Sequence, residues 1–262
     1  MASDFLLNER DGDPVRTNGI PVTSAPFLLV ADHAGAAIPE SLDGLGLGAA
    51  DRGRHIALDI GARELGLALG ERLDAPLLWQ HYSRLVCDCN RHPDDPDWAA
   101  ETSDGTPIPG NAGLDETARR RRLDEVFQPY HAAIEAALEA RRFYGGATVL
   151  VSLHSFTPRM GGKERPWDIG VLHDGREDAF ALAVLERLRA ETGLTIGDNQ
   201  PYDMDDTDYT VPRHAYPRAL PYVELEVRQD HLGEDDSLER IAAILADALT
   251  AALPSGQPPG PS

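Results

Sequence analysis

Two histidines stand where an apolar run of the sequence comes to an end. His33 follows the run that begins at residue 27, and His154 follows the run that begins at residue 149. Buried strands read as continuous apolar runs, and functional groups gather at their carboxyl ends. A catalytic zinc ion takes three protein ligands, often imidazoles, and leaves one position for water. We therefore predict a metal site, with two ordinary loop histidines as the alternative interpretation.

The stretch after His33 offers a candidate for the third ligand. His55 and Asp59 lie four residues apart on a helix predicted over residues 50–73, so they would share one helix face. Asp59 stands in an otherwise apolar stretch, where a carboxylate without a partner is costly. Asp59 is either a metal ligand or the partner of a simple salt bridge with His55 or Arg63.

The segment 222–228 alternates between polar and apolar residues. In a strand this period of two places Glu224, Glu226 and Arg228 on one face. Two carboxylates on one face repel each other unless a cation or a proton intervenes. One of them is a candidate general base for a metal-assisted hydrolysis. The alternative interpretation is an exposed edge strand with alternating charges.

Further side chains are candidates for binding an anionic substrate. Arg84 opens a short apolar run, and Asn90 and Arg91 close it. The planar fork of an arginine fits a carboxylate, although pairing with the abundant surface acids is the alternative. His214 stands just upstream of segment 222–228, where it either lines the same pocket or belongs to a surface loop.

The pattern around these residues predicts an α/β fold with a mostly parallel sheet, because short apolar segments alternate with long amphipathic ones. The predicted strands are residues 27–31, 76–80, 85–88, 147–153, 169–173 and 222–228. The predicted helices are residues 50–73, 115–142, 177–192 and 237–253. Long stretches rich in Pro, Asp and Gly, which often form binding loops, are residues 91–113, 157–168 and 198–218.

The composition limits which binding partners and which cell compartment we expect for this protein. The 262 residues carry a formal net charge of −20, which argues against nucleic acid or an anionic membrane as a partner. No apolar run approaches the roughly 18 residues that span a bilayer. Cys87 and Cys89 stand two residues apart, and residues at this spacing on a strand are about 6–7 Å from each other, too far for comfortable bridging. We expect a cytoplasmic protein with one domain over residues 1–253 and a disordered Pro/Gly tail at 254–262; its oligomeric state is left open.

Five short motifs together resemble the N-formylglutamate amidohydrolase family. They occur in family order over about residues 25–235: 32–35 (DHAG) with 38–39 (IP), 55–61 (HIALDIG), 83–91 (SRLVCDCNR), 153–158 (LHSFTP) and 226–230 (EVRQD). That family is similar in fold to the zinc carboxypeptidases and aspartoacylases. The resemblance implies a single-domain, three-layer α/β/α fold of the phosphorylase/hydrolase-like kind, with a mixed, mostly parallel central sheet.

The resemblance also implies roles for particular residues. His33 and His154 become zinc ligands, Asn90 and Arg91 become a clamp for a substrate carboxylate, and Glu226 becomes the general base.

One position departs from the related carboxypeptidase pattern. That pattern has a glutamate three residues after the first histidine, where this chain has Ala36. The third ligand must therefore come from elsewhere, with Asp59 as the first choice and Glu40 as the second.

The reaction that the resemblance implies is hydrolysis of N-formyl-L-glutamate, a small-molecule N-acyl amino acid, to formate and L-glutamate. Zinc, or another divalent metal that accepts the same ligands, would be the cofactor. Arg84 or Arg228 would stabilise the oxyanion, while His214 and Glu224 would contact the substrate. The family name suggests histidine degradation. The alternatives are a zinc peptidase or deacylase acting on another acylated amino acid or a small peptide, and a non-catalytic metal-binding relative.

Overall fold

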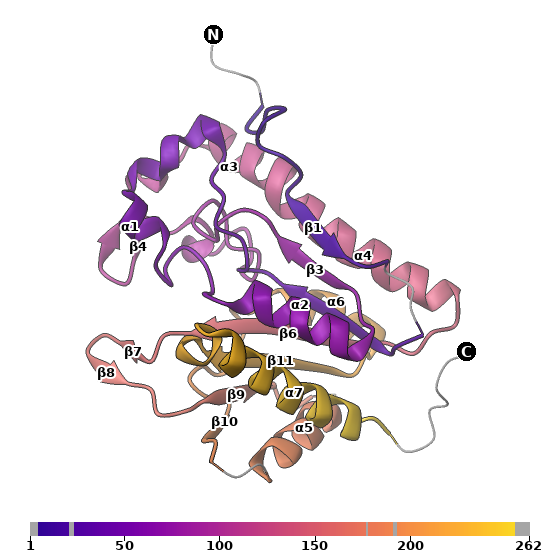
Figure 1. The fold of residues 1–262 in the computed structure, drawn as a ribbon. Coiled ribbons are helices and arrows are strands. Elements are labelled where there is room, and N and C mark those ends of the chain that lie inside the picture. The colour runs from indigo at the N-terminus through magenta and orange to yellow at the C-terminus, as the bar shows by residue number, and fades with distance from the viewer. Residues whose placement is uncertain (1–4, 21–23, 177, 191–192, 255–262) are drawn as a thin grey trace.

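A seven-stranded sheet forms the centre of the molecule (Figure 1). The computed structural model describes residues 5–20, 24–176, 178–190 and 193–254. Strands β3, β2, β6 and β11 run parallel, while β1 at one edge and the pair β9–β10 at the other run in the opposite direction. In spatial order the strands are β1 (Val15–Asn18), β3 (Leu77–Gln80), β2 (Phe27–Ala31), β6 (Val149–Phe156), β11 (Tyr222–Arg228), β9 (Ile169–Leu172) and β10 (Ile196–Asp198).

The central strands are apolar because both of their faces are buried. All five residues of β2 are buried, with Leu28 and Val30 in one apolar core and Phe27, Leu29 and Ala31 in the other. Side chains alternate between the two faces of a strand, so a strand covered on both sides needs apolar residues at every position.

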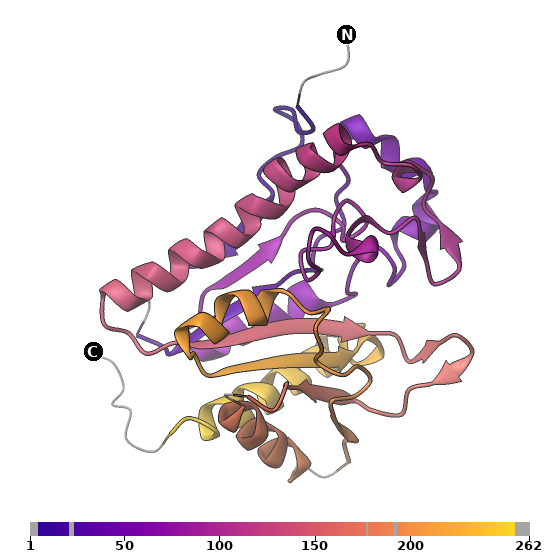
Figure 2. The same cartoon turned by 180° about the vertical axis from the view of Figure 1, so that it is seen from behind.

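Helices cover both faces of the sheet (Figures 1 and 2). Helices α2 (Ala62–Leu73), α5 (Ala179–Arg189) and α7 (Asp235–Ala251) contribute to the core on one face. Helices α4 (Gln128–Phe143) and α6 (Thr210–His214) contribute to the core on the other. The fold is therefore a three-layer α/β/α arrangement around a mixed, mostly parallel sheet, as predicted. Among the described residues, no helix has the length and apolar character needed to cross a membrane.

The single helix predicted over residues 50–73 is wrong. The structure has a short helix α1 (Ala49–Arg52), an irregular segment over residues 53–61, and then α2. The backbone of that segment bonds to other loops: the Asp59 N–H donates to the His33 carbonyl oxygen (2.9 Å), and the Ser83 hydroxyl donates to the Ala57 carbonyl oxygen (2.6 Å). Gly61 then adopts a positive φ of 81° before α2 begins. His55 and Asp59 consequently do not share a helix face.

The predicted strand at residues 85–88 is also wrong. This segment forms a turn, because the Ser83 side chain accepts a hydrogen bond from the Leu85 N–H (3.2 Å) and its carbonyl oxygen accepts one from the Val86 N–H (2.9 Å). Strands β1 and β10, only four and three residues long, were not predicted. The alternative of an exposed edge strand at 222–228 is excluded, because β11 lies between β6 and β9.

The other predicted elements are present with shifted ends. The helix predicted over 115–142 consists of α3 (Glu116–Arg122), one wider π-helical turn (Leu123–Phe127) and α4. Helix α5 falls inside the predicted range 177–192, although residues 177, 191 and 192 lie outside the described part of the chain. Most of the predicted tail, from residue 255 onward, also lies outside it.

Short elements lie between the main helices and strands. Two small hairpins are β4–β5 (Thr102–Ser103 and Thr106–Pro107) and β7–β8 (Arg159–Met160 and Lys163–Glu164). Turns of 3₁₀ helix occupy Glu40–Gly46, Pro96–Ala99, Pro109–Asn111, Tyr216–Arg218 and Gln229–Leu232.

Gly35 allows the chain after β2 to pass against the end of β3. A Cβ atom at this position would overlap the backbone carbonyl oxygens of Gln80 and His81. We expect Gly35→Ala to lower the free energy of unfolding by about 1–3 kcal/mol, measured by urea denaturation. Gly48→Ala is the matched control, because a Cβ at Gly48 meets open space. An equal loss of stability in both variants would contradict the steric explanation.

Candidate active site

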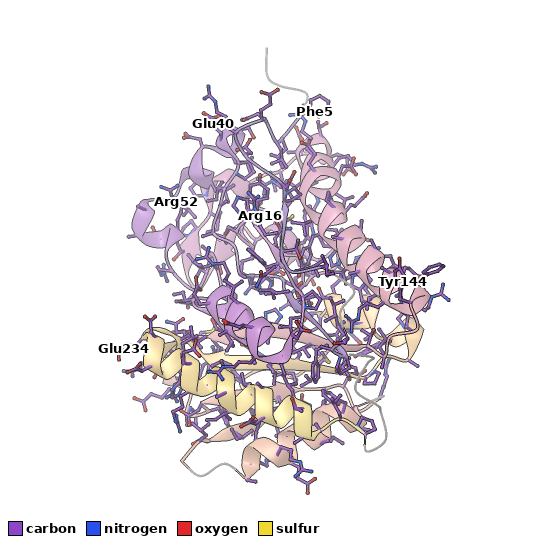
Figure 3. The ribbon with its side chains drawn as sticks, turned by 45° about the vertical axis from the view of Figure 1, so that its right-hand side comes forward. Phe5, Arg16, Glu40, Arg52, Tyr144 and Glu234 are labelled. Atoms are coloured by element: carbon purple, nitrogen blue, oxygen red, sulfur yellow. The ribbon has the colours of Figure 1, made fainter. Side chains whose placement is uncertain are left out.

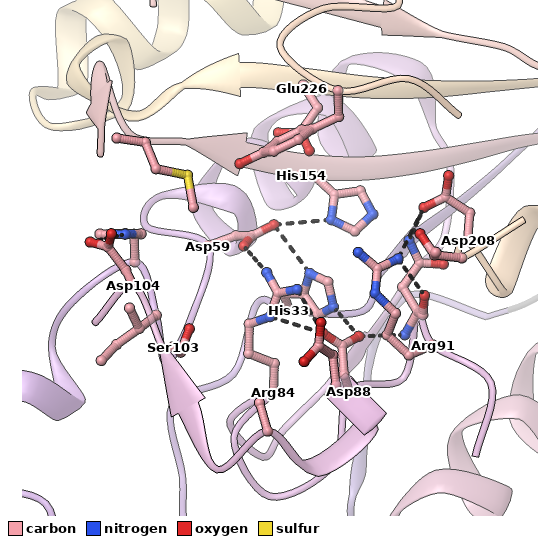
Figure 4. Close-up of a pocket in the computed structure, with 18 of the residues that line it drawn as sticks. His33, Asp59, Arg84, Asp88, Arg91, Ser103, Asp104, His154, Asp208 and Glu226 are labelled. Atoms are coloured by element: carbon pink, nitrogen blue, oxygen red, sulfur yellow. Dashed lines mark hydrogen bonds and ion pairs between the residues drawn. The ribbon is translucent and has the colours of Figure 1, made fainter. Parts of the chain in front are cut away.

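A cavity of about 470 Å³ lies at the carboxyl ends of β2, β6 and β11. These strands are parallel, so side chains near their ends meet at one edge of the sheet. His33 follows β2, while His154 and Glu226 face each other as register partners on β6 and β11. All three line the cavity (Figure 4). Its mouth is formed by loop segments around residues 97–104 and 202–208.

His33, Asp59 and His154 form one buried group with the donor atoms of a metal site. One ligand atom from each lies within 4.8 Å of the other two. Asp59 Oδ2 is 3.0 Å from His154 Nδ1 and 3.5 Å from His33 Nδ1. His33 Nδ1 is buried and has no hydrogen-bond partner among the described residues. Two imidazoles and a carboxylate suit a divalent metal such as zinc, so these residues fit the predicted cofactor.

Asp88 fixes the orientation of His33 from the other side of the ring. Its Oδ1 atom lies 2.7 Å from His33 Nε2, and its Oδ2 accepts hydrogen bonds from Arg84 Nη2 (2.6 Å) and Nε (3.0 Å). Burial would raise the pKa of Asp88, but the positive charge of Arg84 and the contact with His33 hold it well below its usual range. The carboxylate therefore stays ionised and directs Nδ1 of His33 towards Asp59.

His154 and Asp59 are held in the same way. His154 Nε2 lies 3.1 Å from the Ser152 hydroxyl and 3.6 Å from Asp32, so its Nδ1 faces Asp59. Burial acts to raise the pKa of Asp59, but His33 and His154 lower it far more. The Ser155 N–H also donates to Asp59 Oδ2 (3.2 Å). The group thus presents an ionised carboxylate between two imidazole nitrogens.

Glu226 faces this group from β11. Its Oε2 atom is buried and has no hydrogen-bond partner among the described residues. Burial raises the pKa of Glu226 to about 7; His154 opposes this shift and the negative charge of Asp59 adds to it. A carboxyl group with a pKa near neutrality can both accept and return a proton, which suits a general base.

Two arginines form part of the cavity wall. Arg84 lines it, with Nη1 3.6 Å from Asp59 Oδ1, and Arg91 lines it, with Nη1 3.6 Å from Asp208 Oδ1. Asn90 also lies in the wall, but its side-chain oxygen accepts hydrogen bonds from the Tyr209 and Thr210 N–H groups (both 2.9 Å). Asn90 therefore anchors a loop, whereas the Arg91 guanidinium forms part of the cavity wall.

Three of the predicted residues lie away from the cavity. Arg228 is the last residue of β11 and pairs with Asp168 (2.9 Å) instead of lining the cavity. His214 is buried beneath α4 beside His131. Glu40 is exposed on the outer surface, where its backbone N–H donates to Asp11 (Figure 3). We therefore assign none of them a place in the cavity. Among the described residues, the group with His33 and His154 contains Asp59, the first choice for the third ligand, and not Glu40, the second.

Sequence reasoning missed the roles of Asp88, Tyr202 and Asp208. Asp88 belongs to the motif at residues 83–91, two residues before Asn90, so its position in the sequence could have pointed to it. Tyr202 and Asp208 line the cavity from the stretch 198–218, which the sequence marked as a candidate binding loop without singling out either residue. His55 lines the mouth and lies 3.3 Å from Asp104 rather than near Asp59.

The geometry can be compared with known proteins. Residues 25–232 match the family model described as N-formylglutamate amidohydrolase. The chain belongs to this family. As a member of the N-formylglutamate amidohydrolase family, it is a hydrolase that acts on amide bonds, and its buried His33–Asp59–His154 group can hold a metal ion.

Solved structures share its fold. A gene product of Agrobacterium tumefaciens has a TM-score of 0.90 and 34% sequence identity, covering 94% of this chain and 97% of that chain. An N-formylglutamate amidohydrolase from Ralstonia eutropha has a TM-score of 0.66 and 20% identity, covering 91% of this chain and 97% of that chain. No curated protein matches the sequence significantly.

The metal group predicts the effect of removing its carboxylate. We expect Asp59→Asn to weaken metal binding at least about 100-fold, because loss of even an outer partner costs 10–100-fold. Metal content after dialysis against a metal buffer measures this effect. Glu40→Gln is the control and should retain the wild-type content. Loss of metal from the Glu40 variant alone would reverse the assignment.

The buried histidine pair predicts a pH-dependent stability. His131 Nδ1 lies 3.0 Å from His214 Nε2, and burial lowers the pKa of both, that of His214 to about 3. The unfolded chain takes up protons below about pH 6.5 where the folded chain does not, so the free energy of unfolding falls as the pH drops from about 6.5 towards 3.

In His214→Gln we expect the free energy of unfolding to fall less steeply between pH 6.5 and 5 than in the wild type, by up to about 1.4 kcal/mol per pH unit. We expect KM to keep its wild-type value. Urea denaturation at each pH and steady-state kinetics measure the two quantities. His92→Gln, at an exposed histidine, should keep the wild-type slope. A raised KM, with the pH dependence of the free energy of unfolding unchanged, would instead support a role of His214 in substrate binding.

Proposed function

We propose that this chain is a zinc-dependent amidohydrolase that cleaves the amide bond of an N-acyl amino acid. The family's name makes N-formyl-L-glutamate, which would give formate and L-glutamate, the reference substrate. The observation that carries the proposal is that Glu226 and the His33–Asp59–His154 group face one cavity from adjacent parallel strands. A general base and a metal-ligand group that line the same space are what metal-assisted amide hydrolysis requires.

His33, Asp59 and His154 would hold the metal, which when bound supplies Lewis-acid activation of water and of the amide carbonyl. The Glu226 carboxylate accepts the proton of the attacking water and returns it to the leaving nitrogen. Arg84, whose guanidinium reaches the cavity beside Asp59, stabilises the negative charge that develops on the carbonyl oxygen.

Arg91 supports the choice of an amino acid as the leaving group. Its guanidinium lines the cavity at 26% exposure, and its contact with Asp208 is a loose one of 3.6 Å. A planar fork in this position can bind the α-carboxylate of the substrate in two parallel hydrogen bonds. Such binding would hold the scissile amide between Glu226 and Asp59, which lowers the barrier by orientation.

Two alternatives predict different outcomes. A zinc peptidase or deacylase for another acylated amino acid or a small peptide would use the same residues and differ in substrate preference. A non-catalytic metal-binding relative would bind metal and cleave nothing. The buried Oε2 of Glu226 argues against the second alternative, because a carboxylate left without a partner is costly to a protein that makes no use of it.

The proposal is tested by the release of formate or another acid from a panel of N-acyl amino acids that includes N-formyl-L-glutamate. We expect turnover that a chelator abolishes and added zinc restores. Turnover that survives complete removal of metal would refute the metal dependence. Failure to cleave any member of the panel in the zinc-loaded protein would refute the activity.

Glu226→Gln separates the general base from the metal ligands. Because the amide cannot take the proton, we expect kcat to fall by about 10²–10⁴-fold while the metal content stays at the wild-type level. The exposed variant Glu40→Gln should keep the wild-type kcat. Loss of metal together with activity would make Glu226 a ligand instead.

A further inference from the structure

Arg165 is a cation beside the cavity that has no carboxylate partner. It follows the hairpin β7–β8, which projects beyond the carboxyl end of β6 (Figure 1). The Arg165 N–H donates to the Pro158 carbonyl oxygen (2.9 Å) and closes the base of this hairpin. The side chain forms no ion pair with any residue that the structure describes, and its Nη1 atom is buried there without a hydrogen-bond partner. Burying a charged group without a partner is costly, so its place beside a binding cavity requires an explanation.

The guanidinium of Arg165 rests against side chains that line the cavity. Its Nη2 atom donates to Met160 Sδ (2.9 Å), and its Cζ atom lies 4.7 Å from the centroid of the Tyr202 ring. Met160 and Tyr202 both line the cavity. The centroid of the Phe156 ring, at the end of β6, lies 5.8 Å from the same Cζ atom. The rings hold the cation in place without neutralising it, and a thioether is a weak acceptor, so the charge of Arg165 remains available to an anion.

The arginines of the cavity wall already have carboxylates nearby. Arg84 pairs with Asp88 (2.6 Å), and its Nη1 atom lies 3.6 Å from Asp59 Oδ1. The Arg91 Nη1 atom lies 3.6 Å from Asp208 Oδ1, and Arg91 is the group proposed for the α-carboxylate. Of these three arginines, Arg165 is therefore the one whose charge has no use in the protein or in the proposed reaction.

Arg165 acts on the side of the cavity that lies away from Arg91. Burial lowers the pKa of His55, and the charge of Arg165 adds to this lowering against the opposing charge of Asp104. Arg165 is therefore within electrostatic range of His55, which lies 3.3 Å from Asp104. Figure 4 shows Asp104 and Arg91 on opposite sides of the metal-ligand group. The two arginines thus provide positive charge on two different sides of the position proposed for the amide.

Most of the other charged groups that line the cavity are acidic. Glu224, Glu226 and Asp208 line it, as do Asp203 and Asp205 of the mouth. Charges of one sign in a cleft repel ligands of the same sign. A substrate with one carboxylate can rely on Arg91 alone, whereas a substrate with two carboxylates needs a second cation.

We propose that Arg165 determines the specificity of this site by binding the carboxylate of the substrate's side chain. The inference rests on the proposed function, because it assigns a receptor to the side chain of the same substrate. Three groups branch from the α-carbon of an N-acyl amino acid. With the α-carboxylate at Arg91 and the amide at Glu226, the third branch, the side chain, extends towards Arg165.

Met160 covers the group to which the side-chain carboxylate would bind. Met160 is 39% exposed, and its unbranched side chain can move aside at little cost. The carboxylate would replace its sulfur atom as the acceptor for Arg165 Nη2 and would also accept from Nη1. These are the two parallel, charge-assisted hydrogen bonds that a guanidinium makes with a carboxylate.

The test compares kcat/KM of the zinc-loaded protein for N-formyl-L-glutamate and N-formyl-L-glutamine. The two substrates have nearly the same shape, but the side chain ends in a carboxylate in one and in a neutral amide in the other. We expect glutamate to exceed glutamine by about tenfold or more, as for one hydrogen bond between charged groups. Equal values in the wild type would overturn the inference.

Arg165→Gln removes the guanidinium and tests the residue itself. We expect kcat/KM for N-formyl-L-glutamate to fall by about tenfold or more while that for N-formyl-L-glutamine changes little, so that their ratio approaches one. Arg159→Gln is the matched control, because Arg159 is an exposed arginine of the same hairpin that does not line the cavity. Its ratio should equal that of the wild type.

A wild-type ratio in Arg165→Gln would overturn the inference, and so would an equal loss for both substrates, which a merely structural role predicts. If Arg165→Gln does not fold, Arg165→Lys takes its place. An ammonium group lacks the planar fork, so we expect a ratio between one and that of the wild type, and an unchanged ratio is again contrary. Cleavage of no N-acyl amino acid would refute the proposed function, whereas cleavage without a preference for glutamate refutes this inference alone.

Discussion

The site depends on the parallel pairing of β6 with β2 on one side and with β11 on the other. This pairing brings His33, His154 and Glu226, which are far apart in the chain, to one edge of the sheet. Side chains alternate along a strand, so a slip of one residue between β6 and β11 would turn Glu226 away from the cavity and into the apolar core. Apolar packing on both faces of the sheet holds the register. The packing of the core therefore also determines the geometry of the candidate active site.

Charged side chains of alternating sign fix the orientation of the residues that the strand register brings together. Arg84 contacts both Asp59 and Asp88, and Asp88 in turn orients His33. These groups are largely buried, so each depends on its neighbour for the charge that solvent would otherwise supply. The result is a rigid group in which both imidazoles present Nδ1 to one carboxylate. Such pre-organisation lets the protein meet a metal ion without rearranging its ligands.

Local pattern was sufficient for the strands of the site and insufficient for the segments between them. The predicted bounds of β2 and β11 agree with the structure, because a continuous apolar run and a strict alternation are each a local signal. Asp59 is predicted from its apolar surroundings and from a helix that the structure does not contain. Its place comes from a loop that bonds to the backbone of His33. The positions of Arg228 and His214 are set by Asp168 and His131, which are distant in sequence. Periodicity carries no information about such long-range partners.

The loop before α6 is held to the cavity wall partly through its backbone. Asn90 accepts hydrogen bonds from two backbone N–H groups, at Tyr209 and Thr210, and any residue other than proline provides such a donor. Substitutions at the exposed positions of this loop would therefore change the charge and shape of the cavity mouth and leave these two backbone hydrogen bonds in place. The architecture separates the buried side chains at the strand ends from the exposed loops of the cavity mouth. Such a separation would let descendants of one enzyme diverge in substrate without first passing through an inactive intermediate.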